Sequence, residues 1–469
     1  MRHALFLLAA IASAQPYGID QKDFPVSEFQ ERRTKVFDSI GKALAIIPGA
    51  SATDSPQVFR QSNEFYYLTG IEAPHCYLLL DGRSRKTTVY MPHRDPARER
   101  QIGPLVSAED AAVIKERSGV DGVFGVEVLA RHLAPIQIHH PAPALYVPFS
   151  PQEGTHGSRD EMLREVAEAA SDPWDGRPSR NGHLLSLLRN RFPTYELRDL
   201  SPLLDPIRLI KSPREISLIR RASQIAGLAI IEAIRSTEPG VYEYQLDAVA
   251  RYVYLLNGAK HEGYPSIIGG GTNAWHGHYF RNASVLKDGD LVLMDYAPDY
   301  RYYTSDVTRM WPVNGKYTPD QLALCGFILA YRDALLKRIR PGVTPEQVLD
   351  GARPEMEAFL KTLTFSKDIY RKGAEEALRF RGHLSHPVGM TVHDVGSYQR
   401  KEFSEGLVFS IDPMLWIPEE KLYVRMEDVV TVTANGVENF TDFLAAKPEA
   451  IEKLMREDGI LQMRKPTNP

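Results

Sequence analysis

The sequence predicts a mixed α/β (α+β) protein with two domains, and three observations indicate this. The chain has 469 residues, of which 43% are hydrophobic, and single hydrophobic cores rarely extend beyond about 250–300 residues. The first half alternates helical and strand-like segments. The second half opens with a strong helix and changes to strands beyond about residue 264. We therefore expect an N-terminal mixed domain over residues 23–205 and a second domain over residues 206–445.

The first 14 residues have the pattern of a secretory signal peptide. A short basic region precedes the apolar stretch Ala4–Ala12, and Ala12-Ser13-Ala14 fits the small-x-small cleavage pattern. A short buried helix is the alternative. The pattern predicts cleavage near Ala14 and a secreted or periplasmic protein that begins near Gln15. No later stretch reaches the ~20 apolar residues of a membrane span, so we expect none.

The N-terminal domain is expected to begin with a helix that runs from about Pro25 to about Leu44. Three segments rich in apolar and aromatic residues then predict sheet strands bounded by Gly and Asp turns: "EFYYLTGI", "CYLLLDG" and "KTTVYM". The polar Pro/Gly stretch at 171–182 is most simply a surface loop.

The second domain is expected to open with a well-capped helix. Ser212 is a candidate N-cap, Pro213 occupies the first helical position and Glu215 completes a capping box. An apolar helical face follows at Ile216, Ile219, Ala222 and Ile225. A second helix covers roughly 244–256. The strands that follow are interrupted by one helical region near 320–380, and a helical tail is expected over residues 446–469.

Charge and cysteine content exclude several classes of protein. The net charge is −4, with 56 Lys and Arg against 60 Asp and Glu, so no basic excess points to nucleic acid. Cys76 and Cys325 are the only cysteines. This count excludes a disulfide scaffold, and their spacing matches no cysteine motif that binds metal. Both are expected to be buried apolar residues.

Two carboxylates interrupt the strand-like stretch "LVLMDYAPDYRYYTSDVTRMWP" at 291–312. If 298–301 forms a four-residue loop, Asp295 lies opposite Thr304 and shares a face with Asp306. Two carboxylates that share a face within a few Å repel each other unless a cation lies between them. The alternative is one turn-capping Asp and one solvated Asp.

Further polar residues interrupt apolar stretches later in the chain. Asp412 ends "LVFSID", Glu427 lies within "LYVRMEDVVTVT", and His383, His386 and His393 lie in "HLSHPVGMTVHD". Oxygen ligands with one imidazole suit two divalent cations such as Mn²⁺, Co²⁺, Zn²⁺ or Fe²⁺. Two such ions can hold a hydroxide at neutral pH and stabilise a tetrahedral intermediate, which is hydrolase chemistry.

These residues carry a family resemblance. In their order, "HYFRN", "MDYAPDYRYYTSDVTR", "HLSHPVGMTVHDVG", "IDP" and "RMED" resemble the Xaa-Pro aminopeptidase (aminopeptidase P) and prolidase family of pita-bread-fold metallopeptidases. "FRQSNEFYYLTGIEAP" at 59–74 resembles the amino-terminal domain of aminopeptidase P. The likeness covers nearly the whole mature chain. It implies an aminopeptidase P-like N-terminal domain followed by a catalytic pita-bread domain.

The resemblance also implies a role for each site residue and two metal ions, with manganese the leading candidate. It implies that Asp295 binds one metal, that His386 and Asp412 bind the other, and that Asp306 and Glu427 bridge both. His278 and His393 are implied to flank the substrate and hold its carbonyl and developing oxyanion, with Arg425 supporting the site through its charge. A plain salt bridge is the alternative for Arg425. His276 and His383 are not expected to be ligands.

The chain departs from the family pattern at two positions. Asp412 stands where the family usually has a Glu that is also given a proton-shuttling role, and Asp is shorter by about 1.5 Å. Metal–ligand distances tolerate only about ±0.2 Å, so the strand shifts inward, a water intervenes or the site holds metal more weakly, and the proton-shuttling role implies a change in rate. Gly382 stands where a His is usual, and His383 follows one position later.

The resemblance leaves several functions open. The leading expectation is a secreted, dinuclear aminopeptidase that cleaves a peptide with proline in second position by a metal-bound hydroxide. A prolidase restricted to Xaa-Pro dipeptides, a catalytically weakened binding protein of the same fold and a metal-free creatinase-like hydrolase are the alternatives. The resemblance implies a homo-oligomer, either a dimer or a tetramer.

Overall fold

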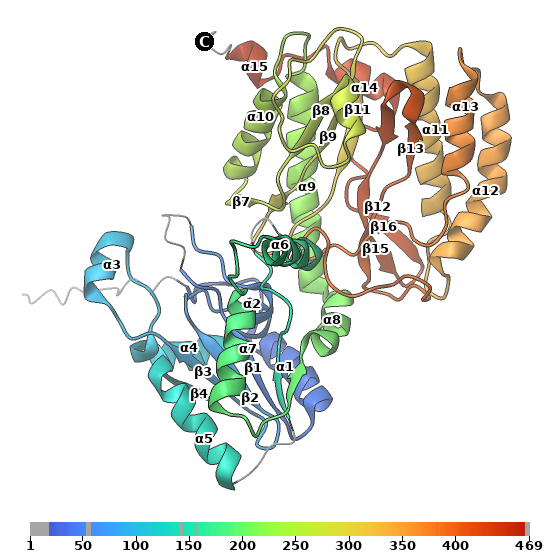
Figure 1. The fold of residues 1–469 in the computed structure, drawn as a ribbon. Helices are drawn as coiled ribbons and strands as arrows, with labels where there is room; N and C mark the ends of the chain where they lie inside the picture. The colour runs from blue at the N-terminus through green and yellow to red at the C-terminus, as the bar shows by residue number, and fades with distance from the viewer. Residues whose placement is uncertain (1–17, 53–57, 140–143, 155–156, 465–469) are drawn as a thin grey trace, which may run out of the picture. The chain divides into compact units, whose positions relative to one another are not determined.

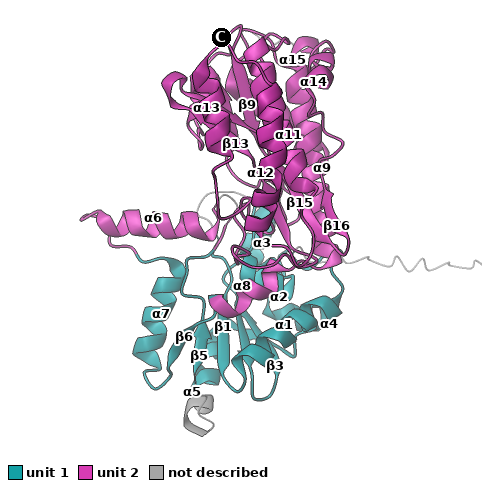
Figure 2. Cartoon of the chain, turned by 90° about the vertical axis from the view of Figure 1, so that its right-hand side faces the viewer, with its two compact units in different colours: residues 1–152, 178–201 teal, residues 153–177, 202–469 magenta. Residues whose placement is uncertain are grey.

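The computed structural model describes residues 18–52, 58–139, 144–154 and 157–464. The predicted signal peptide at 1–14 and the mature start at Gln15 lie outside these residues. No helix of the described chain is both long and apolar enough to cross a membrane. Two compact units make up the chain: residues 1–152 with 178–201, and residues 153–177 with 202–469 (Figure 2). The predicted range 23–205 thus contains two segments, 153–177 and 202–205, that belong to the second unit, and the domain limits at 205 and 445 stay predictions.

The first unit is built on a six-stranded sheet in the order β4-β3-β2-β1-β5-β6. Strand β2 pairs antiparallel with both β1 and β3. The other pairs are parallel: β4 with β3, β5 with β1 and β6 with β5. The strands are β1 (Leu44–Pro48), β2 (Tyr77–Asp81), β3 (Lys86–Met91), β4 (Gly122–Gly125), β5 (Leu145–Val147) and β6 (Leu197–Asp199). The helices are α1 (Val26–Ile40), α2 (Asn63–Thr69), α3 (Pro96–Ile102), α4 (Ala111–Ser118), α5 (Leu129–His139) and α7 (Arg180–Arg191). This mixed sheet with its helices matches the predicted α/β character.

One predicted strand of this unit is wrong, because the stretch "EFYYLTGI" forms helix α2. Its residues Phe65, Tyr66, Tyr67 and Leu68 are all buried, and a short apolar run that is buried all round has no period that separates strand from helix. Gly70 ends the helix in the left-handed conformation, with a φ of 67°. The other two segments form β2 and β3 as expected.

Helices of the second unit pack in pairs around its strands. Helices α9 and α10 lie side by side, as do α11 and α12, and α13 packs against β13 (Figure 1). Helix α9 begins at Pro213 with Ser212 as N-cap and Glu215 closing the capping box, which confirms the predicted start. The helices are α6 (Arg159–Ser171), α8 (Ser201–Leu209), α9 (Pro213–Arg235), α10 (Glu243–Leu256), α11 (Pro319–Leu336), α12 (Pro345–Thr362), α13 (Asp368–Ala377), α14 (Pro448–Leu454) and α15 (Ile460–Met463).

In the part of this unit that the structure describes, the strands form four short antiparallel sheets: β11-β9-β8, β12-β15-β16, β13-β14 and β10-β7. An isolated bridge between Thr308 and Glu427 brings the first two sheets together. The strands are β7 (His261–Glu262), β8 (Ile267–Gly270), β9 (Leu291–Asp295), β10 (Pro298–Asp299), β11 (Thr308–Pro312), β12 (Val408–Ile411), β13 (Met414–Ile417), β14 (Leu422–Arg425), β15 (Asp428–Thr433) and β16 (Gly436–Asn439).

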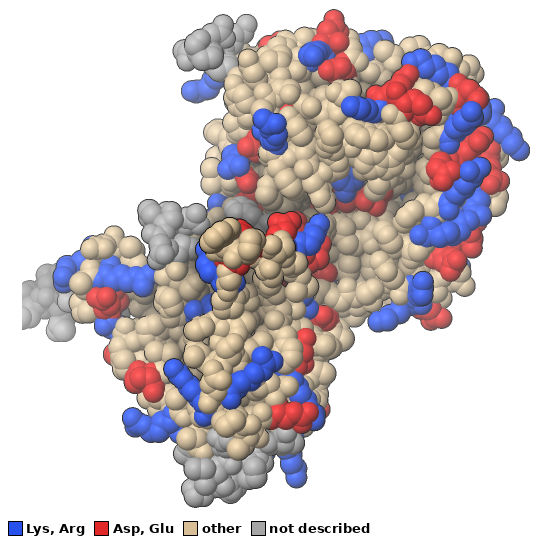
Figure 3. Space-filling model, in the orientation of Figure 1, with Lys and Arg blue, Asp and Glu red and all other residues tan. Residues whose placement is uncertain are grey.

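One hydrophobic core runs through the second unit, from α9 and α10 to the strands and α11–α13. Cys325 belongs to it, and Cys76 is buried in the first unit, as predicted for both cysteines. Acidic and basic side chains are interspersed over the face that Figure 3 draws. Asp295 ends β9 and Asp412 directly follows β12, so these two carboxylates lie where strands of the apolar core end.

Candidate active site

Asp295 and Asp306 come from the connection between β9 and β11, whose register differs from the predicted one. The predicted four-residue loop at 298–301 puts Asp295 opposite Thr304, whereas the structure pairs Asp295 with Thr308. Residues 298 and 299 form β10 and pair with β7 instead. The loop prediction is wrong because a second sheet holds the middle of the connection.

The two carboxylates nevertheless meet. Both are buried, and the Tyr264 hydroxyl oxygen lies 2.5 Å from Asp295 Oδ1 and 2.9 Å from Asp306 Oδ1. A hydroxyl has one proton to donate, so it cannot satisfy two ionised carboxylates at once. Burial, followed by the charge of Asp295, raises the pKa of Asp306 well above its ordinary value.

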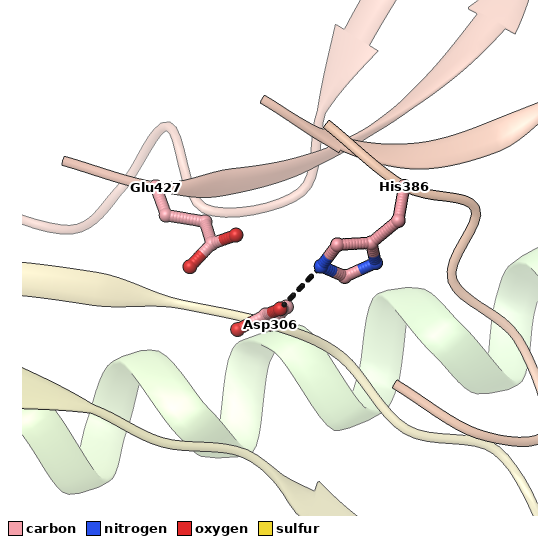
Figure 4. A group of neighbouring side chains, drawn as sticks. All are labelled: Asp306, His386 and Glu427. Carbon is pink, nitrogen blue, oxygen red and sulfur yellow. Dashed lines mark ion pairs between the residues drawn. The ribbon is translucent and has the colours of Figure 1, made fainter. Parts of the chain in front are cut away.

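Asp306, His386 and Glu427 bring one ligand atom each within 4.8 Å of one another. Their side chains point toward a common centre from three separate segments of the second unit (Figure 4). His386 Nε2 lies 3.2 Å from Asp306 Oδ2, and burial lowers the pKa of His386 to about 3. A neutral imidazole beside two carboxylates is a donor set that divalent transition metals bind.

Arg425, at the end of β14, connects the remaining acids to this group. Its guanidinium Nη1 lies 2.7 Å from Asp295 Oδ2, and Nη2 lies 2.6 Å from Glu427 Oε2 and 3.5 Å from Asp412 Oδ2. Burial opposes the charged form, but the neighbouring acids, led by Glu427, raise the pKa of Arg425 well above its ordinary value. This one cation therefore contacts three of the five predicted ligands.

A buried ion network fixes the backbone at Glu427. The next residue, Asp428, is fully buried and accepts from Arg309 Nη2 at 2.6 Å and from Arg332 Nη1 at 2.9 Å. Arg309 Nη1 also donates to the Glu427 carbonyl at 2.8 Å. Removing one member of such a network leaves an uncompensated buried charge, so the network stabilises the backbone from which the Glu427 side chain extends.

The acids of the site fit a divalent cation. Burial is the largest cause that raises the pKa of Asp306, Glu427 and Asp412. Glu427 Oε1 is fully buried and has no hydrogen-bond partner among the described residues, although its other oxygen accepts from Thr308 Oγ1 at 2.9 Å. An unsatisfied buried carboxylate oxygen costs free energy that a bound cation recovers.

Asp412 lies at the border of the group. Asp412 Oδ2 lies 3.5 Å from Arg425 Nη2. Asp412 is not one of the three residues whose ligand atoms lie within 4.8 Å of one another. It also lines a largely apolar cavity together with His383 and Trp416. His383 packs edge-on against Phe380. Asp412 therefore stays a predicted ligand, as does its weaker hold on a metal.

His278 and His393 lie beside the acids in one pocket. The ring centroid of His393 lies 4.3 Å from that of His386 and 6.4 Å from that of His278. Burial lowers the pKa of His278, whereas Asp160 overcomes the effect of burial and raises the pKa of His393. The pocket is lined by Glu161, Tyr264, Ile267, His278, Phe280, Asp295, Asp306, Val392, His393 and Arg425. His276 is exposed and does not line it.

Comparison with known proteins gives the family. Residues 217–434 match the Metallopeptidase family M24, and residues 29–145 match the Aminopeptidase P N-terminal domain. The chain is 30% identical over 450 residues to the Xaa-Pro aminopeptidase of Escherichia coli (strain K12), covering 91% of this chain and 97% of the relative. The chain belongs to the aminopeptidase P family of M24 metallopeptidases. The family implies divalent metal ions, which the donor set described above fits.

Further relatives and solved structures agree with membership of the aminopeptidase P family. Xaa-Pro aminopeptidase 3 of Homo sapiens is 30% identical over 403 residues, covering 82% of this chain and 74% of the relative. Aminopeptidase P from E. coli with the inhibitor Pro-Leu has a TM-score of 0.73 and 27% identity, covering 93% of this chain and 99% of that one. Proline aminopeptidase P II from Yersinia pestis has a TM-score of 0.74 and 29% identity, covering 92% and 100%. The predicted family and fold class are confirmed.

Three residues at this aminopeptidase P site were missed by the sequence reasoning: Tyr264, Asp160 and Glu161. Tyr264 belongs to no pattern that marks it as a partner of carboxylates. Helix α6 carries a capping box from Ser158 to Glu161, a readable signal for a helix start. No signal in the sequence says that this helix start contacts the segment containing His393.

The start of α6 holds His393 at two points. The backbone N–H of His393 donates to Ser158 Oγ at 3.1 Å, and its Nδ1 lies 3.4 Å from Asp160 Oδ2. This pairing is the largest cause that lowers the pKa of Asp160 to about 2. A carboxylate on one ring nitrogen fixes the tautomer and the orientation of the other nitrogen.

We expect Asp160→Ala to lower kcat about tenfold with little change in KM, because His393 loses the partner that orients its ring. Asp160→Asn keeps an acceptor for the Nδ1 proton and should retain more of the activity. Steady-state kinetics of both variants would measure the effect, with Glu168→Gln, an exposed change on the same helix, as the control. Equal losses in all three variants would contradict a specific role for Asp160.

Proposed function

We propose that this protein is an Xaa-Pro aminopeptidase that removes the N-terminal residue from peptides with proline in second position, using two divalent cations. The observation that carries the proposal is the convergence of Asp306, His386 and Glu427 within 4.8 Å, beside Asp295 and Arg425. The Xaa-Pro aminopeptidases among its relatives support the reaction type.

The residues that would hold the two cations are the five predicted ligands: Asp295, Asp306, His386, Asp412 and Glu427. When bound, two such cations polarise a carbonyl and supply a nucleophile from water at neutral pH. Manganese remains the leading candidate, since carboxylate-rich sets with one imidazole suit it. Metal analysis of the protein purified without added metal tests that choice.

The chain's own residues account for binding and orientation. His278 and His393 lie on one side of the acids, where they can donate to the substrate carbonyl and to the oxyanion that develops from it. Arg425 balances the charge of Asp295 and Glu427 without entering the reaction. The bond before proline lacks an N–H, so a site built on donors to the carbonyl suits it better than recognition by strand addition.

The test compares two peptides that share their first two residues, Ala-Pro and Ala-Pro-Ala, with the full-length protein loaded with Mn²⁺. We expect alanine to be released from the tripeptide with a kcat/KM at least about tenfold higher than from the dipeptide, and the chelated protein to be inactive. Ala-Ala-Ala, which lacks proline, is the control substrate.

Each alternative gives a different result in that assay. Cleavage of the dipeptide alone would identify a prolidase. Stoichiometric metal with no turnover would identify a binding protein, and turnover that survives metal removal would identify a creatinase-like hydrolase. We also propose export after cleavage near Ala14 and assembly into a dimer or tetramer. The N-terminal mass of exported protein and sedimentation of the purified protein test these two proposals.

A further inference from the structure

We propose that Glu161 binds the cationic side chain of an N-terminal Arg or Lys in the substrate and so makes the enzyme prefer a basic residue before proline. The inference rests on the proposed Xaa-Pro aminopeptidase function and adds the substrate class. Glu161 lies on the first turn of α6 and lines the same pocket as His278, His393 and the acids of the site.

The lining of this pocket combines apolar and aromatic side chains with the Glu161 carboxylate. Ile267 and Val392 are the apolar aliphatic residues of the lining. The residue Phe280 is 46% exposed, and its ring stacks on that of His278 with 5.8 Å between centroids. Arg and Lys place their methylene groups against apolar surface and their charged groups on aromatic faces and carboxylates.

The carboxylate of Glu161 is fixed at the pocket by a hydrogen bond that leaves further acceptor positions. Its Oε2 accepts from the Ser158 N–H at 2.8 Å, which closes the capping box. A carboxylate has about four acceptor positions, so this bond leaves capacity for a guanidinium or an ammonium. The neighbouring acid Asp160 pairs with His393 and Arg164. Glu161 is therefore the acid of α6 that faces the pocket.

The other acids of the pocket lining, Asp295 and Asp306, support the assignment of Glu161 as the binding residue. Asp295 is already paired with Arg425, and both Asp295 and Asp306 belong to the predicted metal ligands. Glu161 is the acid of the pocket lining outside that group, and its negative charge acts on both His278 and His393. A cationic group of the substrate at this point meets a carboxylate that the metal centre does not need.

The test uses Arg-Pro-Pro, citrulline-Pro-Pro and Leu-Pro-Pro with the Mn²⁺-loaded enzyme. Citrulline has nearly the shape of Arg but no charge. We expect wild type to cleave the Arg peptide with a kcat/KM about tenfold above that of the citrulline peptide, as for one charge-assisted hydrogen bond. Glu161→Gln should bring that ratio close to one, because it lowers kcat/KM for the Arg peptide more than for the citrulline and Leu peptides. Gln still accepts from the Ser158 N–H, so the capping box stays intact.

Glu165→Gln, an exposed change one turn further along α6, is the matched control and should behave as wild type. The inference is overturned if wild type shows no preference for Arg over citrulline, or if the preference survives in Glu161→Gln. It is also overturned if Glu161→Gln slows all three peptides equally, because the carboxylate then binds the α-ammonium group they share. If wild type cleaves none of the three, the proposed function itself fails.

Discussion

Asp306→Asn is expected to lower kcat/KM by about a thousandfold or more, because the predicted bridging ligand loses its charge. Asp306 lies at the centre of the group, 3.2 Å from His386 and within hydrogen-bonding distance of Tyr264. The amide keeps the size and the contact with Tyr264. The loss of activity should therefore be accompanied by loss of bound metal, measured by elemental analysis of the purified variant.

The same change should make the metal-free protein more stable. Burial raises the pKa of Asp306 and of Glu427, so the folded state holds these protons more tightly than the unfolded chain. The contribution of these two acids to the stability of the metal-free protein is then largest at low pH and is lost as the pH rises from the ordinary range near 4 through the raised values. Asp306→Asn removes one titrating group, so its metal-free Tm should exceed that of wild type at neutral pH and fall less with pH.

Asp288→Asn provides the control, since Asp288 is an exposed acid just before β9 that accepts from Asn314 Nδ2 at 2.6 Å. It should leave activity, metal content and the pH dependence of Tm unchanged. An Asp306→Asn protein that keeps stoichiometric metal and full activity would show that the acids gather for a reason other than metal binding.

The part of the fold that the sequence predicted rests on local signals. Ser212, Pro213 and Glu215 specify a helix start by contacts within one turn, and α9 begins there. The acids and His386 could be recognised as a group because each interrupts an apolar stretch, where an unpaired polar side chain is costly. Their order along the chain then matched a known family.

The part that was not predicted depends on contacts between distant segments. The connection after Asp295 is held by pairing of β10 with β7, and nothing within the loop encodes that partner. The strand assigned to "EFYYLTGI" is a helix because it is buried on all sides, which removes the period that a surface helix shows. Asp160 and His393 are 233 residues apart, and their contact follows only from the packing of α6 in the second unit.

Asp412→Glu is expected to raise metal affinity at least about tenfold. The Asp412 carboxylate lies at the border of the site, 3.5 Å from Arg425 and outside the group gathered within 4.8 Å. One added methylene extends its reach by about 1.5 Å, whereas ligand distances vary by only about ±0.2 Å. Asp412 also borders a cavity, so a longer side chain can be accommodated without displacing the core. Competition with a chelator of known affinity measures the gain.

Asp412→Asn separates reach from charge, because it keeps the length of Asp and removes the negative charge. If Asp412 is a ligand, Asn should weaken metal binding about 10- to 100-fold while Glu strengthens it, and activity at limiting metal should follow the same order. Equal affinity in wild type, Asn and Glu would show that Asp412 does not bind the metal. Tighter metal binding without faster turnover would show that metal affinity does not limit the rate. The rate would then depend on how this carboxylate is positioned toward the substrate.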